Sequence, residues 1–339
     1  MANTTAGNNP ALSPLNVYYD KVLLPRLIAK TVYHNLTYKR GLPDGSGRTY
    51  SWTVGGVQPQ NTTPLVEGIP VLPGPTTSTT ITTQLQEYGN VFAASSLLAN
   101  TSVVPAFKYL MEQVEQAGAY AVDALIRNEA FNSGQTTFGI NLFAANQRGS
   151  VNAVTSSDVL TLADVRAAHF ILEQNNVPTY SEDKYVGVVT TGQKYDLTNS
   201  NAGGGFLDLA KQNPEGIKNI KQSVKFPADA NVNPIGEYAG MVLFSTSLNP
   251  VIANGSSGIN NHYAAFWGDS SLASVELDGE QFKIFTKRAG ASDTTYDVIE
   301  MIKMASGYKV GFSAKNLSQD YTTFSNQRVI QMVSASSIF

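Results

Sequence analysis

The stretch GLPDGSGRTYSWTVGG, residues 41–56, and the stretch TTSTTITTQLQEYG, residues 76–89, decide the fold of this chain. Both are rich in Thr and Gly, and both alternate apolar with polar residues in the way that a half-buried strand does. Residues 49–54 predict one strand, with Tyr50, Trp52 and Val54 on one face, and residues 76 to about 88 predict the return strand. Together the two stretches predict a long two-stranded ribbon.

The ribbon is unusually poor in charge. No lysine occurs between Arg40 and Lys108, and the charged residues of this span are Asp44, Arg48, Glu67 and Glu87. Soluble monomers protect exposed strand edges with Lys, Pro or inward-pointing charge, because unpaired backbone groups can pair with another chain. A long two-stranded ribbon is also marginal in water by itself. We therefore expect another subunit to cover the ribbon, which favours an assembly protein over a free enzyme.

The composition is that of a globular protein with a polar but weakly ionic surface. The chain has 339 residues, of which 42% are hydrophobic and only 14% are charged. Cysteine is absent, which excludes disulfides, thiolate metal sites and thiol nucleophiles. No apolar run approaches the roughly 18 residues of a membrane helix. The net charge of −3 is too small to indicate a nucleic-acid or membrane surface.

The charge is unevenly placed along the chain. Residues 1–40 hold one acidic residue, Asp20, against five cations, a net of +4 that leaves −7 for the remainder; the cations are Lys21, Arg26, Lys30, Lys39 and Arg40. The first sixteen residues are polar and interrupted by proline, so they are expected to be flexible or ordered only by a partner. Either the basic arm of one copy lies on the acidic body of another, or it is a solvated tail.

The rest of the chain predicts helices first and strands last. Residues 105–132 predict the longest helix, and residues 161–174 predict a second helix capped by Thr161 with Asp164. Residues 185–191 predict a buried strand, followed by a short helix to about residue 199 and a strand over residues 238–245. Five further strands are predicted at 274–277, 281–287, 296–304, 308–312 and 328–333. This order predicts an α+β fold in which the last strands pack back onto the long helix.

Residues with catalytic potential form no recognisable site. His34, His169 and His262 are far apart in sequence and are interpreted as structural or surface residues. The segment Ser181–Lys184 fits the spacing S-x-x-K but lacks the companion tripeptides of that mechanism. The acidic residues of the long helix, Asp123 among them, are expected on its solvated face. The sequence thus predicts no catalytic, cofactor-binding or metal-binding residue and no enzyme.

Read in order, these parts resemble the major capsid proteins of tailed bacteriophages, most closely the branch typified by the capsid protein of coliphage N4. The resemblance covers nearly the whole chain and lies in the order and spacing of short stretches. These are YYDK (18–21), TPLVEG (63–68), TTITTQLQEYG (79–89), YVGVV (185–189), GEYAG (236–240) and YKVGF (308–312).

The resemblance implies the α+β fold of these capsid proteins, with an N-arm, an extended E-loop hairpin, a long spine helix, and peripheral and axial domains. The implied division is an N-arm at 1–40, an E-loop at 41–95, a peripheral domain at 96–150 and 272–339 with the spine helix at about 105–132, and an axial domain at 151–271. The implied interface residues are Trp52, Ile81, Leu85 and Tyr88 in the ribbon and Lys21, Arg26 and Lys30 in the arm.

The implied function is self-assembly, as hexamers and pentamers, into the icosahedral shell of a virion that encloses phage DNA. Assembly would take place in the cytoplasm of the host bacterium, with a portal, and contact with the packaged double-stranded DNA would be weak and independent of sequence. No cofactor and no membrane is implied. An encapsulin-type nanocompartment, which shares the fold, and a soluble enzyme of unknown class are the alternatives.

Two departures from the family refine this expectation. Some members cross-link through a lysine on the ribbon, which this ribbon lacks, so a non-covalent shell is predicted, with a decoration protein as an open additional partner. Other members carry a long cleaved scaffolding segment, whereas the arm of this chain begins within the first sixteen residues, which favours a separate scaffolding protein.

Overall fold

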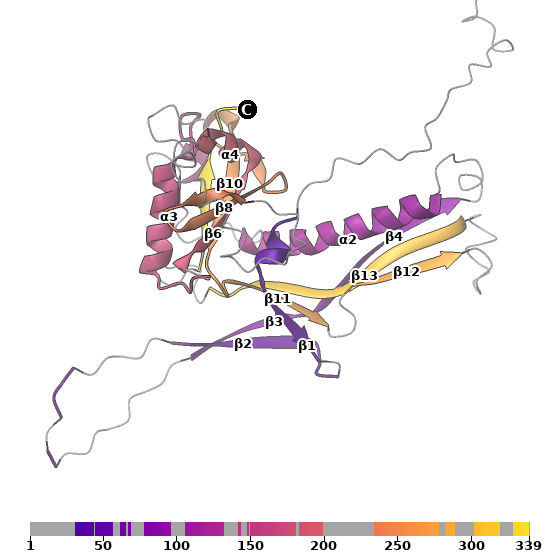
Figure 1. Ribbon diagram of the computed structural model, residues 1–339, viewed down its shortest axis with the longest axis horizontal. Coiled ribbons are helices and arrows are strands. Elements are labelled where there is room, and N and C mark those ends of the chain that lie inside the picture. Colours follow the sequence, from indigo (N-terminus) through magenta and orange to yellow (C-terminus); the bar gives the residue numbers. More distant parts are fainter. Residues whose placement is uncertain are drawn as a thin grey trace, which may run out of the picture. The chain divides into compact units, whose positions relative to one another are not determined.

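A computed structural model of the chain describes residues 31–43, 45–56, 62–65, 67–68, 78–95, 106–131, 142–143, 148, 150–180, 183–198, 234–277, 282–288, 302–318 and 328–338. Contacts divide the chain into two compact units. One comprises Met1–Ile28, Val91–Val114 and Phe285–Gly307, and the other comprises Ala29–Asn90, Glu115–Ile284 and Tyr308–Phe339. Helices and strands both contribute to the fold, as the α+β prediction required (Figure 1).

Three α-helices are described, and all three were predicted. They are α2 (Ala106–Ala130), α3 (Leu162–Gln174) and α4 (Thr191–Thr198), with short 3-10 turns η2 (Tyr33–Leu36), η3 (Val151–Ala153) and η5 (Ser256–Gly258). The 25 residues of α2 extend about 37 Å at 1.5 Å per residue. Helix α3 begins as predicted, because Thr161 Oγ1 accepts the Asp164 N–H while Asp164 Oδ2 accepts the Thr161 N–H at 2.9 Å.

A seven-stranded sheet holds the main core. Its strands are β5 (Leu142–Phe143), β6 (Tyr185–Thr190), β7 (Pro234–Tyr238), β8 (Met241–Thr246), β9 (Val251–Ala253), β10 (Asn260–Trp267) and β14 (Val329–Ser334), in the order β5-β14-β10-β6-β8-β7 with β9 also on β10. Every residue of β6 and β14 is buried. Val165, Ala168 and Leu172 of α3 join this core, which explains the apolar periodicity of that helix.

This sheet departs from the predicted strands in several places. Strand β10, which pairs with β14, β6 and β9, was not predicted, and neither were β5, β7 and β9. The strand predicted over 238–245 corresponds to β8, and a turn at Ala239 and Gly240, whose φ angles are 48° and 77°, joins β8 to β7. Strand β14 was grouped with the peripheral segment 272–339, yet it pairs with β10 of the segment 151–271. The division into capsid domains remains a prediction.

A second sheet has five strands. They are β1 (Tyr38–Leu42), β4 (Gln86–Ser95), β11 (Leu272–Leu277), β12 (Lys283–Arg288) and β13 (Ile302–Asn316), in the order β1-β11-β13-β12 with β4 also on β13. Strands predicted separately at 296–304 and 308–312 are thus one strand from Ile302 onward, and residues 296–301 lie outside the described residues. The last strands do pack on α2, since a Cβ on Gly118 would lie 3.4 Å from the Tyr308 ring of β13 and 2.2 Å from the ring of Phe282, just before β12.

Candidate subunit interface: the ribbon and the root of the arm

The predicted ribbon exists and forms a sheet of its own. Strands β2 (Thr49–Gly55) and β3 (Ser78–Gln84) pair antiparallel from Thr49 opposite Gln84 to Gly55 opposite Ser78. The return strand was expected to run to about Tyr88, but β3 stops at Gln84 and the chain continues as β4 to Ser95 in the five-stranded sheet. The Leu85 N–H between the two strands donates to Arg48 O at 2.8 Å. The chain therefore changes sheets at Leu85.

One face of the ribbon packs against the chain's own body. Trp52 and Leu85 are buried, and Tyr50 and Ile81 are partly buried against them, in an apolar group that we call the root cluster. The buried members of the root cluster are Leu42, Trp52, Leu85, Ala273, Val275 and Leu317. A hydrogen bond of 2.6 Å between Thr83 Oγ1 and Ser313 Oγ adds a polar tie to β13. The apolar residues of the ribbon thus hold it to its own subunit.

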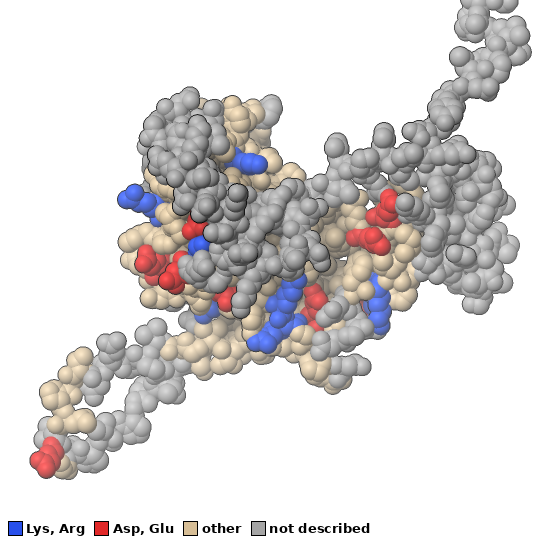
Figure 2. Space-filling model, in the orientation of Figure 1, with Lys and Arg blue, Asp and Glu red and all other residues tan. Residues whose placement is uncertain are grey.

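The opposite face of the ribbon is exposed and carries only neutral side chains. Cross-strand partners on this face include Ser51 with Thr82 and Thr53 with Thr80, and all four residues are exposed. Figure 2 draws the projecting part of the ribbon in tan and grey except for one acidic group near its end. We call Thr49, Ser51, Thr53, Thr80, Thr82 and Gln84 the threonine face.

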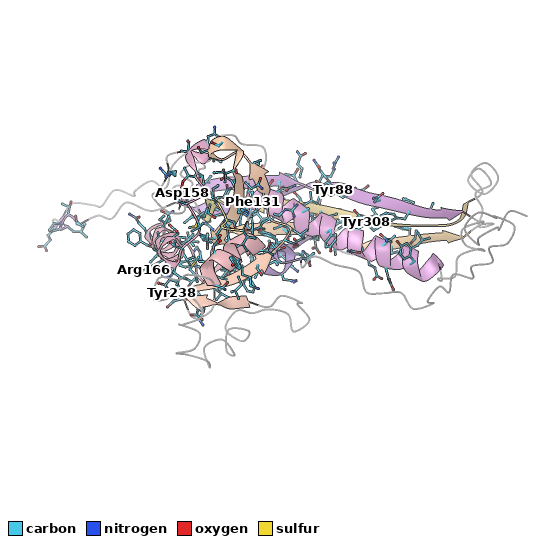
Figure 3. The ribbon with its side chains drawn as sticks, turned by 90° about the horizontal axis from the view of Figure 1, so that it is seen from above. Tyr88, Phe131, Asp158, Arg166, Tyr238 and Tyr308 are labelled. Carbon is cyan, nitrogen blue, oxygen red and sulfur yellow. The ribbon has the colours of Figure 1, made fainter. Side chains whose placement is uncertain are left out.

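A polar cleft of about 370 Å³ lies where the ribbon joins the body. Its walls come from the end of β3, the start of β4, the second half of α2 and β13. The charged residues that line it are Glu129 and Lys315, and Tyr88 lies on the β4 side. Figure 3 labels Tyr88 on this strand and Tyr308 on β13. The cleft is continuous with the threonine face, because Thr82 and Gln84 line it as well.

The point where the arm joins the body is firmly buried. We call Val32–Leu36 the arm root. Tyr33 has no exposed surface, its ring stacks on Trp267 with centroids 5.6 Å apart, and its hydroxyl donates to Asn249 Oδ1 at 2.6 Å. Its ring also meets Phe131, which Figure 3 labels at the end of α2. These contacts fix the chain at the arm root. The arm cations Lys21, Arg26 and Lys30 lie outside the described residues.

Burial shifts the pKa of two ionisable residues at the arm root, Asp123 beside it and His34 within it. Asp123 of α2 is fully buried and accepts the His34 N–H on Oδ1 at 3.2 Å, which corrects the expectation that it lies on the solvated face. Burial raises the pKa of Asp123, although the backbone N–H groups of the arm root and Arg127 oppose the rise. Burial and then the nearby Lys39 ammonium, 3.0 Å from His34 Nε2, lower the pKa of His34 to about 4.

The four ribbon residues predicted for an interface thus divide into two pairs. Trp52 and Leu85 are buried by their own chain, whereas Ile81 and Tyr88 keep part of their surface exposed. All four residues remain predictions as contacts between subunits. Sequence reasoning missed the threonine face because it searched for apolar residues, and this face carries Thr, Ser and Gln instead. The signal that could have found it is the absence of charge at alternate positions of both strands.

Other kinds of site find little support in the described part of the chain. No group of three or more His, Asp or Glu residues there is arranged to hold a metal ion. Among the described helices, none is both long and apolar enough to cross a membrane.

Comparison with known proteins places the fold. No family model and no curated protein matches the sequence. The capsid of Ralstonia phage GP4 matches with a TM-score of 0.71 at 14% identity, over 99% of this chain and 98% of that chain. The cyanophage Pam1 capsid matches over 100% of both chains, with a TM-score of 0.65 at 11% identity. The head of Helicobacter pylori bacteriophage KHP40 matches with a TM-score of 0.63 at 12% identity, over 98% and 99%. The chain therefore has the fold of phage major capsid proteins.

Proposed function

We propose that this chain is the major capsid protein of a tailed phage and that its role is structural rather than enzymatic. Many copies would assemble, as hexamers and pentamers, into the icosahedral shell of the virion. The observation that carries the proposal is the threonine face, an exposed strand surface without a single charge on a chain with a capsid fold. Because β2 and β3 form a two-stranded sheet, each strand also has an outer edge whose backbone groups can pair with a second chain.

The chemistry of the threonine face suits a reversible, repeated interface. Burying a hydroxyl that finds a hydrogen-bond partner costs far less than burying an ammonium or a carboxylate. Thr and Ser also lose less side-chain entropy on ordering than Lys or Glu. The neighbouring subunit would cover the threonine face and the exposed parts of Ile81 and Tyr88, while Trp52 and Leu85 hold the ribbon in position for that contact.

The arm would supply the second contact. Lys21, Arg26 and Lys30 belong to a segment of net charge +4, and the remainder of the chain carries −7, so an arm of one copy is attracted to the body of the next. Contact with packaged DNA would be weak and independent of sequence, because the acidic body repels phosphate.

The remaining parts of the proposal follow from the family resemblance. The stretches 79–89 and 236–240 support a place in the branch typified by the coliphage N4 capsid protein. A portal and a separate scaffolding protein would take part in assembly in the cytoplasm of the host, and a decoration protein is an additional candidate partner. The absence of lysine from residues 41–107 supports a shell without covalent bonds through the ribbon.

Sedimentation of the purified protein tests the proposal. We expect megadalton shells from the unaltered chain and from the control Gln174→Lys, which changes an exposed residue of α3. Thr80→Lys on the threonine face and Ile81→Lys on the partly exposed opposite face of the ribbon should both leave a folded chain that sediments slowly. Normal shells from both ribbon variants would exclude the ribbon as the contact. A stable 36.4 kDa monomer with enzymatic turnover would refute the capsid function altogether.

The contents of the purified particles separate the two kinds of shell. Double-stranded DNA inside particles from infected cells is expected for a capsid. Particles that instead hold a protein cargo and no genome would identify an encapsulin-type compartment.

A further inference from the structure

The hydrogen bonds of the ribbon determine which of its backbone groups point outward. The Leu85 N–H donates to Arg48 O at 2.8 Å, next to the pair in which Thr49 lies opposite Gln84. In an antiparallel ladder, pairs that exchange hydrogen bonds alternate with pairs that do not. The hydrogen-bonded pairs inside the ribbon are therefore Tyr50 with Thr83, Trp52 with Ile81 and Val54 with Thr79.

The residues between these pairs direct their backbone N–H and C=O groups to the outer edges of the ribbon. They are Thr49, Ser51, Thr53 and Gly55 in β2 and Ser78, Thr80, Thr82 and Gln84 in β3. Most of these residues form the threonine face, so the same residues offer a neutral side chain on the face and backbone groups at an edge. In the described part of the chain, neither edge pairs with a further strand. Each edge is therefore open to a third strand.

The polar cleft distinguishes the two edges. Thr82 and Gln84 of β3 line the cleft, whereas no residue of β2 does. Another wall belongs to β13, and the hydrogen bond of 2.6 Å between Thr83 Oγ1 and Ser313 Oγ brings the two strands together beside the cleft. A strand laid along the edge of β3 can therefore continue into a cleft of about 370 Å³, which the edge of β2 does not border.

The side chains along the edge of β3 determine the chemistry of the added strand. Directly opposite Thr80 and Thr82, a residue of the added strand meets a hydroxyl, and Thr or Ser in that position forms a favourable cross-strand pair. An ionised side chain there would lose water without gaining an opposite charge, because the threonine face has none. Inside the cleft, Glu129 and Lys315 offer one charge of each sign. The partner that fits is an extended, neutral segment that ends in polar or charged residues.

We propose that the outer edge of β3 pairs with an extended segment of a second copy of this chain, through the backbone groups of Ser78, Thr80, Thr82 and Gln84. Every copy presents the edge once, so a regular shell needs one pairing segment for each copy, and a neighbouring copy supplies it in that ratio. Pairing with a different segment of the neighbour is a heterologous contact, which can repeat around a ring of copies. The inference rests on the proposed capsid function and adds to it the strand edge and the backbone groups that make the contact.

A proline on each edge tests the pairing. Thr80→Pro removes an outward N–H from β3, and Thr53→Pro removes the outward N–H of its cross-strand partner in β2. Neither substitution removes a hydrogen bond between β2 and β3, because both N–H groups point away from the ladder. In sedimentation, Thr80→Pro should lose the megadalton shells, whereas Thr53→Pro should form them as the unaltered chain does. Thr80→Val, which keeps the N–H and loses only the hydroxyl, should also form shells.

Hydrogen exchange measures the same contact in the unaltered protein. In shells assembled from the purified chain alone, the amides of Thr80 and Thr82 should exchange about tenfold more slowly than in the unassembled chain. The amides of Ser51 and Thr53, on the other edge, should change little. This comparison decides the matter if both proline variants fail to fold or to assemble, because it needs no substitution.

Three results would overturn the pairing of β3 with a second copy. Two of them are normal shells from Thr80→Pro and a slowing of exchange at Thr53 that equals or exceeds that at Thr80. The third is slow exchange at Thr80 that occurs only in particles from infected cells, since another protein would then occupy the edge. These results leave the capsid function standing, because Ile81→Lys and the unaltered chain test it separately. An unaltered chain that forms no shells would instead count against both proposals.

Discussion

Asp123 caps a 3-10 turn that lies far from it in the sequence. The arm root begins a 3-10 turn at Val32, whose own side chain provides no cap, and the carboxylate of Asp123 accepts the His34 N–H instead. The sequence could not show this, because the amphipathic pattern of α2 locates its apolar stripe and not a carboxylate beside that stripe that serves a segment about ninety residues earlier. The buried carboxyl group of Asp123 is tolerated here because backbone N–H groups donate hydrogen bonds to it.

Replacing Asp123 should loosen the arm root. Asp123→Ala leaves the buried His34 N–H without an acceptor, which should lower the free energy of unfolding by about 1–3 kcal/mol. Urea unfolding of the unassembled chain measures this change. Glu115→Ala, at an exposed position of the same helix, is the matched control and should change little. Equal losses in the two variants would show that Asp123 is not a cap.

His34 should make the stability of the body depend on pH. Its pKa is about 4 in the folded chain and 6.5 otherwise, so the folded chain binds fewer protons than the unfolded chain between these values. The contribution of neutral His34 is complete above pH 6.5 and is lost as the pH falls towards 4, by about 1–3 kcal/mol in all. Unfolding of the unaltered chain and of His34→Gln at several pH values isolates this contribution from that of Asp123.

The nearby lysine offers an independent check of the same effect. Lys39→Met removes the smaller of the two causes, so the pKa of His34 should rise part of the way towards 6.5 and the loss of stability in acid should shrink. An unchanged acid response would mean that Lys39 does not act on His34.

At the scale of elements, the sequence predicted what local chemistry specifies. The cap Thr161 with Asp164 fixes the start of α3 within the segment itself, and the prediction was confirmed. Strand β10 was not predicted because apolar and polar residues do not alternate in its sequence NNHYAAFW. Pairing with strands on both of its edges makes this segment a strand. Strand β13 was divided at Gly307, whereas pairing with β11, β12 and β4 keeps one strand through that glycine.

Gly89 marks the place where β4 comes closest to β13. A Cβ at this position would lie 2.6 Å from Tyr308 O, and a backbone atom cannot yield as a side chain can. Gly89→Ala should therefore destabilise the chain by about 1–3 kcal/mol in thermal unfolding. Gly55→Ala, in β2 with nothing within 4 Å of the added carbon, should be neutral or slightly stabilising. If the two variants have equal stability, the close approach of the strands is excluded.

At the scale of the whole molecule, the ribbon divides its two faces between two tasks. Its apolar face completes the root cluster of its own chain, whereas its threonine face is exposed, and a second chain covers that face in the proposal above. The sequence located the ribbon because alternation and missing charge are visible in residue order. The sequence did not show whether a given face is covered by the same chain or by a neighbouring one, because strands of both kinds have the same alternation of apolar and polar residues.

The missing lysines lead to a prediction for the assembled shell. An amide bond through the ribbon needs an amine there, and residues 41–107 contain no lysine, so subunits should be joined by non-covalent contacts alone. Purified shells heated in sodium dodecyl sulfate should then yield a single band at 36.4 kDa. The control is Gln174→Lys, which adds an amine away from the ribbon, should still form shells and should give the same single band. A ladder of dimers and larger species that persists after heating would mean that a covalent bond forms between subunits outside the ribbon. The stability of the shell would then not depend only on non-covalent contacts at the threonine face.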